Sequence, residues 1–204
     1  MTSTTPQPGS KKPATRTSST TRDLALIAVF TAIIIVLGFV SIPVGAAGVP
    51  IVLQNAAVIL AGLVLGGRRG FFTAALFLLI GLALPVLAGG RTTIYAIGSP
   101  TVGYLVGYLI SAFVAGFIAY RAPQANKLAA TLVLILAGFV GLFFQYLCGV
   151  FGLMWRSGLD FGAAWAAQLP FVLPDSGKVA VMVAIALAVH AAFPHLKSSE
   201  MARR

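Results

Sequence analysis

Charged side chains, and acidic ones above all, are scarce in this sequence. Lys and Arg together contribute 14 residues and Asp and Glu only 4, so charged residues make up 9% of the 204-residue chain. A soluble domain carries about 25%. Hydrophobic residues make up 59%, and the mean hydropathy is +0.98. So little polar surface excludes a water-soluble globular domain and indicates a protein whose solvent is lipid.

Cysteine and histidine are nearly absent, which excludes several kinds of chemistry. The single cysteine, Cys148, lies inside an apolar run and rules out both a disulfide within the chain and a cysteine-based metal site. The two histidines, His190 and His195, have no carboxylate motif beside them, and there is no His-Glu-x-x-His pattern. A phosphate-binding Gly-x-x-x-x-Gly-Lys-Ser/Thr loop is missing as well. We therefore expect no metal, no cofactor, no ATP hydrolysis by this chain and no enzymatic activity.

The positive net charge of +10 is distributed along the chain in a way that argues against a nucleic-acid partner. A nucleic-acid-binding domain gathers its Lys and Arg residues on one folded face. Here they fall in short groups between apolar runs, which is typical of membrane topology instead. We expect no nucleic acid among the partners of this protein.

Six apolar runs are long enough to cross about 30 Å of hydrocarbon as helices. The breaks between them carry the Gly and Pro residues of loops. We predict an all-α integral membrane protein with a six-helix membrane domain over residues 23–196. The runs cover approximately residues 24–40, 51–66, 71–88, 98–120, 128–154 and 175–194. The second run is short enough to be tilted or partly re-entrant.

The two ends of the chain are polar and basic. Residues 1–22 are rich in Ser, Thr and Pro without apolar periodicity, so we predict a disordered basic tail, and residues 197–204 form a second basic tail. A secretory signal peptide is the alternative at the N-terminal end. Its apolar region would normally span about 7–15 residues, whereas the run over 24–40 is longer and leads into further apolar segments.

The distribution of Lys and Arg predicts the orientation, because short cytoplasmic loops retain these residues. With six spans, both termini lie on one side, together with the loops that follow the second and fourth runs. Eleven basic residues fall on that side and three on the other, so we predict that both termini are cytoplasmic. The eleven are Lys11, Lys12, Arg16, Arg22, Arg68, Arg69, Arg121, Lys127, Lys197, Arg203 and Arg204, against Arg91, Arg156 and Lys178.

Two of the rare charges, Asp175 and Lys178, stand together at the outer end of the sixth run, after Pro170 and Pro174. In a helix that starts near Asp175, the i,i+3 spacing places both side chains on one face. Asp175 would then cap the helix and pair with Lys178 at the interface. Alternatively, both side chains line an outward-facing pocket, because ionisable groups kept near hydrocarbon usually mark a ligand path.

A basic residue in a glycine-rich outer loop supports the pocket interpretation. Arg91 follows two glycines, which let the backbone fold tightly and approach a ligand. Other residues toward the outer halves of their runs combine apolar surface with a polar tip, and we expect them to line the pocket. Ordinary interfacial or interhelical hydrogen bonding is the alternative for each of them. They are Gln54, Asn55, Tyr95, Tyr104 and Tyr108.

Small residues recur at helical spacing in two runs. In the fourth run they stand every fourth residue, which lets another helix approach closely, and we interpret this as packing within the chain rather than dimerisation. The stripe consists of Gly103, Gly107, Ser111, Ala115 and Ala119. The first run holds Ala25, Ala28 and Ala32, but alanine is common in such helices and this signal alone is weak.

Taken together, these stretches resemble the BioY family, the biotin-specific substrate-binding (S) components of energy-coupling-factor (ECF) vitamin transporters. The resemblance covers essentially residues 24–194, with several motifs in family order. The segment "SPTVGYLVGY" and the "LPxDxxK"-like segment "LPDSGK" are fairly specific together, and neither is specific alone. The matching stretches are "VPIVLQNAAVILAGLVLG" (49–66), "IGLALPVLAGG" (80–90), "GSPTVGYLVGYLISAF" (98–113) and "LPFVLPDSGKVAVMVAIALAV" (169–189).

The resemblance implies a bundle like that of other ECF S components, in a prokaryotic cytoplasmic membrane, with biotin bound near the outer face. Asp175 and Lys178 would then lie near biotin, where the carboxylate can accept from the ureido N–H groups. Lys178 or Arg91 would donate to the ureido carbonyl or pair with the tail carboxylate, and the sequence does not decide which. Ala28 and Ala32 would meet a transmembrane coupling subunit, which works with two ATP-binding-cassette (ABC) ATPases.

Three other functions share parts of this pattern. An S component for a different vitamin would have the same architecture. A solitary biotin transporter that acts as an oligomer would need no ATPases. A membrane enzyme would need a catalytic constellation, and the sequence offers none.

Overall fold

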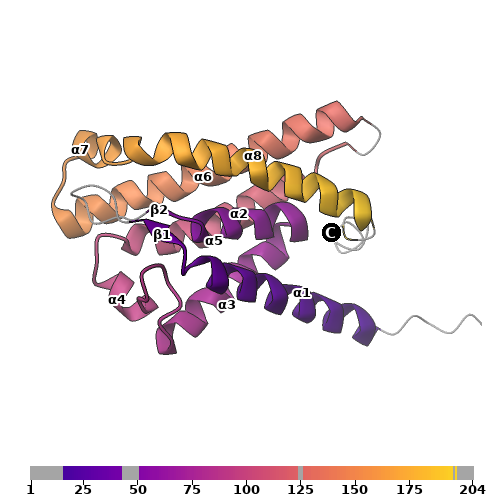
Figure 1. Ribbon diagram of the computed structural model, residues 1–204, viewed down its shortest axis with the longest axis horizontal. Coiled ribbons are helices and arrows are strands. Elements are labelled where there is room, and N and C mark those ends of the chain that lie inside the picture. Colours follow the sequence, from indigo (N-terminus) through magenta and orange to yellow (C-terminus); the bar gives the residue numbers. More distant parts are fainter. Residues whose placement is uncertain (1–15, 43–50, 124–125, 195, 197–204) are drawn as a thin grey trace, which may run out of the picture.

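The protein is a bundle of helices (Figure 1), and the computed structural model describes residues 16–42, 51–123, 126–194 and 196. The predicted tail over 197–204, most of the tail over 1–22 and the middle of the first loop lie outside these residues. The helices are α1 (Arg16–Leu37), α2 (Gln54–Leu65), α3 (Gly67–Ala83), α4 (Thr93–Ile97), α5 (Val102–Ala119), α6 (Lys127–Ser157), α7 (Phe161–Ala166) and α8 (Leu169–Ala192).

A short antiparallel hairpin closes one end of the bundle. Its strands are β1 (Ser41–Ile42) and β2 (Ile51–Val52), with Ser41 opposite Val52 and Ile42 opposite Ile51. In Figure 1 the hairpin, α4 and α7 gather at the left, whereas the start of α1 and the end of α8 lie at the right. We call the end with the hairpin, α4 and α7 the capped end, and the opposite end the basal end.

The described residues are mostly helical, and among them four helices are long and apolar enough to cross a membrane. These are α1, in its part Thr20–Leu37, and α5, α6 and α8. α2 and α3 correspond in order to the second and third predicted runs, but they have 12 and 17 residues. A 12-residue helix spans about 18 Å, well short of the hydrocarbon core. The chain turns directly from α2 into α3 at Gly66, whose φ of 89° is accessible to glycine.

Two helices begin earlier than the sequence predicts. α1 starts at Arg16 rather than near Leu24, so part of the predicted tail is helical. Its first turns are held by an ion pair of 2.9 Å between Asp23 and the buried Arg69 of α3. α8 starts at Leu169 rather than near Asp175. Pro170 stands in its first turn, where a proline lacks no helical hydrogen bond.

α5 lies at the centre of the bundle and packs against α2, α3 and α6. Small residues let these backbones approach closely. A Cβ atom added to Gly103 would overlap the carbonyl oxygen of Cys148 on α6, and one added to Gly116 would overlap the backbone at Gly66. Gly107 likewise lies against Gln145 of α6. The predicted small-residue stripe on α5 is therefore confirmed as packing within the chain.

We predict that Gly103→Ala destabilises the protein, because its Cβ atom would meet backbone, which cannot rotate away. Overpacking of this kind costs about 1–3 kcal/mol. The temperature of thermal unfolding in detergent should fall. Gly177→Ala is the matched control, since nothing lies within 4 Å of a Cβ atom at that exposed helical position. An equal effect of the two changes would contradict the close α5–α6 approach.

Candidate ligand-binding site

A cavity lies at the capped end, between the hairpin and the helices. It encloses about 730 Å³, open space at its mouth included, which is within the range of small-molecule pockets. Apolar and aromatic side chains form most of its wall, and polar groups enter from five elements. Its lining consists of Ile51, Val52, Gln54, Asn55, Leu87, Ala88, Arg91, Ala96, Thr101, Tyr104, Leu105, Tyr108, Gln145, Tyr146, Gln168, Phe171, Asp175 and Lys178.

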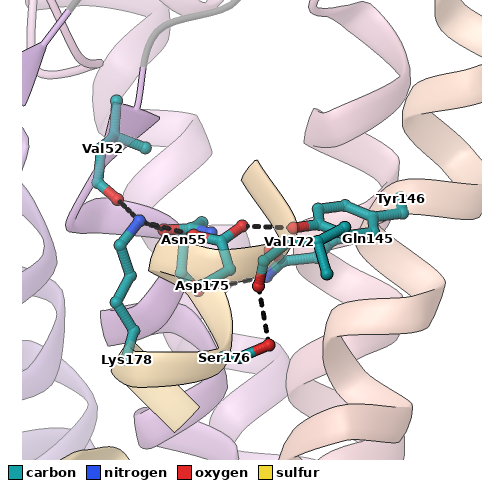
Figure 2. Close-up of polar contacts among 8 residues, drawn as sticks. All are labelled: Val52, Asn55, Gln145, Tyr146, Val172, Asp175, Ser176 and Lys178. Carbon is teal, nitrogen blue, oxygen red and sulfur yellow. Dashed lines mark hydrogen bonds and ion pairs between the residues drawn. The ribbon is translucent and has the colours of Figure 1, made fainter. Parts of the chain in front are cut away.

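The centre of the polar wall is the ammonium group of Lys178 (Figure 2). It forms an ion pair of 2.6 Å with Oδ1 of Asp175, donates to the carbonyl oxygen of Val52 at 2.6 Å, and donates to Oδ1 of Asn55 at 3.2 Å. An ammonium group has three donors, and these contacts engage all three. The side chain thus joins α8 to β2 and to the first turn of α2.

Asp175 is buried on the other side of this pair. Its side chain is 4% exposed, and Oδ2 accepts a hydrogen bond of 2.8 Å from the hydroxyl of Tyr146 on α6. Figure 2 shows the carboxylate lying between Lys178 and Tyr146. Both carboxylate oxygens have a donor, which offsets the cost of burying the charge.

Of the two alternatives for Asp175, the helix cap is excluded. Gln168 is the N-cap of α8, and Asp175 lies about two turns further on, after Pro174 inside the helix. The chain continues as helix through Pro174, so Asp175 faces the bundle instead of the helix start. The predicted ion pair on one helix face is present, and it belongs to the cavity wall.

Gln54 lines the cavity, but its amide holds the surrounding backbone together. Nε2 donates to the carbonyl oxygens of Ile34 at 3.1 Å and Val86 at 2.8 Å, while Oε1 accepts from the amide of Ala88 at 3.1 Å. These bonds tie the end of α1 and the segment after α3 to the start of α2. Asn55, the next residue, has its Nδ2 group without a hydrogen-bond partner among the described residues.

The two tyrosines predicted on α5 both line the cavity. The hydroxyl of Tyr104 donates to Oε1 of Gln168 at 2.7 Å, so its polar tip is engaged. The hydroxyl of Tyr108 has no hydrogen-bond partner in the part of the chain that the structure describes, although the residue is buried. Tyr108 therefore offers both a ring wall and an unused hydroxyl to a ligand.

Arg91 reaches the cavity from the loop between α3 and α4. Gly89 and Gly90 have φ angles of 74° and 69°, which favour glycine, and they close a tight turn in which Leu87 and Arg91 pair as an antiparallel bridge. The guanidinium lies 5.2 Å from the ring of Tyr95 and has no ion-pair partner among the described residues. Tyr95 itself is 57% exposed and stands outside the cavity lining.

Sequence inspection missed several polar residues of the cavity. Gln145 lies in the middle of α6 and donates to the backbone oxygen of Asn55 at 3.1 Å and to Ser111 at 3.0 Å. Gln168, Tyr146 and Thr101 complete the set. A glutamine inside the apolar run "GLFFQYLCG" was a usable signal, because an amide in hydrocarbon is costly unless it is hydrogen-bonded.

The side chains that line the cavity carry a net positive charge. Asp175 and Lys178 neutralise each other, and Arg91 adds one positive charge that no carboxylate of the lining balances. The site therefore suits a ligand with a neutral hydrogen-bonding end near the pair and an anionic end near Arg91. Among the described residues no group of three His, Cys, Asp or Glu side chains is placed to hold a metal ion.

The structure thus has the features of a membrane protein: a bundle of apolar helices with a small-molecule-sized cavity at one end. Known proteins are similar to it in sequence and in fold. Residues 10–195 match the BioY family. The biotin transporter BioY of Rhizobium etli is 37% identical over 181 residues, covering 86% of this chain and 97% of that protein. The biotin transporter BioY of Rhodobacter capsulatus is 39% identical over 172 residues, covering 78% and 88%. The chain belongs to the BioY family.

The fold is also similar to a crystal structure of the S-component for biotin from an ECF-type ABC transporter. The TM-score is 0.77 and the sequence identity 29%, over 87% of this chain and 95% of that chain. The predicted family resemblance is thus confirmed along nearly the whole sequence.

We predict a strong coupling between Asp175 and Lys178 in stability. Removing one partner, as in Asp175→Asn or Lys178→Met, leaves the charge of the other buried without a counter-charge. The free energy of unfolding should fall by about 3–5 kcal/mol. The double variant should lose less than the sum of the two. Thermal unfolding in detergent measures this, with Ser176→Ala as a control on the same helix, since Ser176 bonds only within α8. Additive losses would contradict the coupling.

Proposed function

We propose that this protein captures biotin from outside the cell and acts as the S component of an ECF-type transporter. The observation that carries the proposal is the cavity at the capped end, where a buried Asp175–Lys178 pair and a separate cation, Arg91, face one enclosed space. The relatives named as biotin transporters support the choice of ligand.

Biotin has chemistry that matches each part of this wall. Its ureido ring carries two N–H donors and one carbonyl acceptor, its thioether ring is apolar, and its flexible tail ends in a carboxylate. The ureido N–H groups fit the carboxylate of Asp175, whose oxygens retain unused lone pairs. The ureido carbonyl fits the free Nδ2 group of Asn55, or Lys178 in exchange for one of the three contacts that its ammonium group makes. The thioether ring fits the aromatic walls of Tyr108 and Phe171.

Charge balance assigns the carboxylate of the tail to Arg91. Lys178 already has an ion-pair partner at 2.6 Å, so a second carboxylate there would compete with Asp175 for one cation. Arg91 has no such partner among the described residues. A planar guanidinium also binds a carboxylate in bidentate fashion. Arg91 therefore fixes which end of biotin faces the loop.

We propose that six helices span the membrane, with both termini in the cytoplasm. The basic residues at the basal end support this orientation. The shorter helices α2 and α3 would reach across the bilayer as a joined pair with the loop segments that follow them. The capped end, which holds the cavity, then faces outward. The tails over 1–22 and 197–204 would remain inside.

We propose that energy for release comes from partner subunits, since the sequence has no phosphate-binding loop. Ala25, Ala28 and Ala32 are exposed on α1, where a helix of a transmembrane coupling subunit could approach closely. That subunit would transmit the work of two ABC-type ATPases. The small side chains leave the α1 backbone accessible on this face.

Calorimetry on the detergent-purified protein tests the ligand. Biotin should bind tightly, and thiamin, which is cationic, should not bind beside the uncompensated Arg91. Arg91→Ala should weaken biotin about tenfold or more, because a hydrogen bond to a charged group contributes about 1.5–3 kcal/mol. The same variant should bind biotin amide, which lacks the carboxylate, almost as well as the parent does.

Arg156→Ala is the matched control for Arg91→Ala. Arg156 is a basic residue at the same end, but it donates to the carbonyl oxygen of Ile97 and does not line the cavity. Selective loss of biotin over biotin amide in Lys178→Met would assign the carboxylate to Lys178 instead. Binding of thiamin with no binding of biotin would reject the proposed substrate.

Transport by cells that contain the coupling subunit and the ATPases tests the docking face. Ala28→Trp should bind biotin as the parent does but abolish uptake, because the indole ring would block close helix approach. Ala180→Trp, at an exposed position of α8, should transport normally. Normal uptake by Ala28→Trp would remove α1 from the docking surface. Uptake in cells without the partner subunits would favour a solitary transporter.

A further inference from the structure

A groove on the outside of the bundle plays no part in the cavity. It runs between α3 and α5 toward the basal end and encloses about 690 Å³, its open side included. Its lining is apolar except for one guanidinium, and consists of Arg68, Phe71, Phe72, Leu109, Ile110 and Phe113. At Arg68, Phe72 and Phe113 the groove meets a second hollow, of about 1150 Å³, which reaches α1.

One cation lines both the groove and the hollow, and a second contacts a residue of the hollow's wall. Arg68 is exposed and has no hydrogen bond or ion pair to another described residue. Arg121, just after α5, lies with its guanidinium 3.4 Å from the ring centroid of Phe117, and it donates to the carbonyl oxygen of Phe117 at 3.3 Å. Phe117 lines the hollow together with Arg68, so Arg121 lies against the wall of the same hollow that Arg68 lines.

The acidic residues of the described chain leave these two cations unbalanced. Asp23 lines the hollow but forms its ion pair with Arg69 at 2.9 Å. Asp160 caps α7 and Asp175 lies in the cavity, both away from this groove. Arg68 lines the apolar groove, Arg121 contacts the wall of the adjoining hollow, and neither forms an ion pair with a described residue. This arrangement is complementary to an amphiphile with an anionic head.

We propose that this groove binds an anionic phospholipid of the inner leaflet. Its phosphate lies between Arg68 and Arg121, and one acyl chain follows the α3–α5 groove along Phe72 and Phe113. Basic sites between membrane helices select anionic headgroups in this way. A soluble phosphate would leave the apolar groove empty, so the groove itself favours a lipid. The site shares no residue with the cavity, so it does not depend on the proposed ligand, and only its assignment to the inner leaflet rests on the proposed orientation.

Native mass spectrometry of the full chain tests this proposal. The detergent-purified protein is mixed with equal amounts of phosphatidylglycerol and phosphatidylcholine that carry the same acyl chains. Retention of the first phosphatidylglycerol molecule should exceed that of phosphatidylcholine at least fivefold. The double variant Arg68→Ala with Arg121→Ala should lose this preference. Arg156→Ala, which removes the same charge at the capped end, should keep it.

A second variant separates the acyl chain from the headgroup. Ile110→Trp fills the groove while both arginines remain, and it should lower phosphatidylglycerol retention at least fivefold. Unchanged retention in Ile110→Trp would mean that the lipid does not use the groove, and the proposal would be wrong. Equal retention of the two lipids by the parent would also overturn it, as would an unchanged preference in the double arginine variant.

Discussion

The ammonium group of Lys178 is the contact on which the capped end depends. Its three bonds reach the backbone of β2, the side chain of Asn55 and the carboxylate of Asp175, which Tyr146 holds from α6. A charge buried beside apolar helices must be satisfied on every donor, or the fold loses several kcal/mol. The same requirement that stabilises the hairpin therefore also gathers the cavity wall. Stability and binding geometry arise here from one set of contacts.

Two glutamine side chains form hydrogen bonds with backbone polar atoms at this end of the bundle. Irregular backbone within hydrocarbon is tolerated only where other groups satisfy its polar atoms. Gln54 does so for the end of α1 and the segment after α3, and Gln145 does so for the first turn of α2. The loops that close the cavity are thus fixed by side chains that point away from solvent. The side chains of Arg91 and Tyr108 and the Nδ2 group of Asn55 line the cavity and keep hydrogen-bonding groups that no described residue uses.

The sequence predicted the features that follow from local patterns and failed where they depend on packing. Hydropathy located the helices, and the spacing of Gly103 and its neighbours predicted the close α5–α6 contact. The Asp175–Lys178 pair was found because charges are rare. Its place in the helix was predicted wrongly, because proline normally marks a helix start and here the helix continues through Pro174. Tyr95 was predicted to line the cavity because it lies toward the outer half of its run, whereas on α4 its side chain is mostly exposed and outside the cavity lining.

The hydrogen bonds within the polar wall affect both the binding and the release of a ligand. Lys178 and Asp175 are bonded to each other and to three other elements. The protein itself therefore holds the polar wall in place, which lowers the ordering entropy that a ligand must offset. A ligand that adds a bond to Arg91 would join the loop after α3 to the same wall, and each such contact would slow its release. In the proposed function, the coupling subunit would drive release through the exposed small side chains of α1, which lie outside the cavity lining.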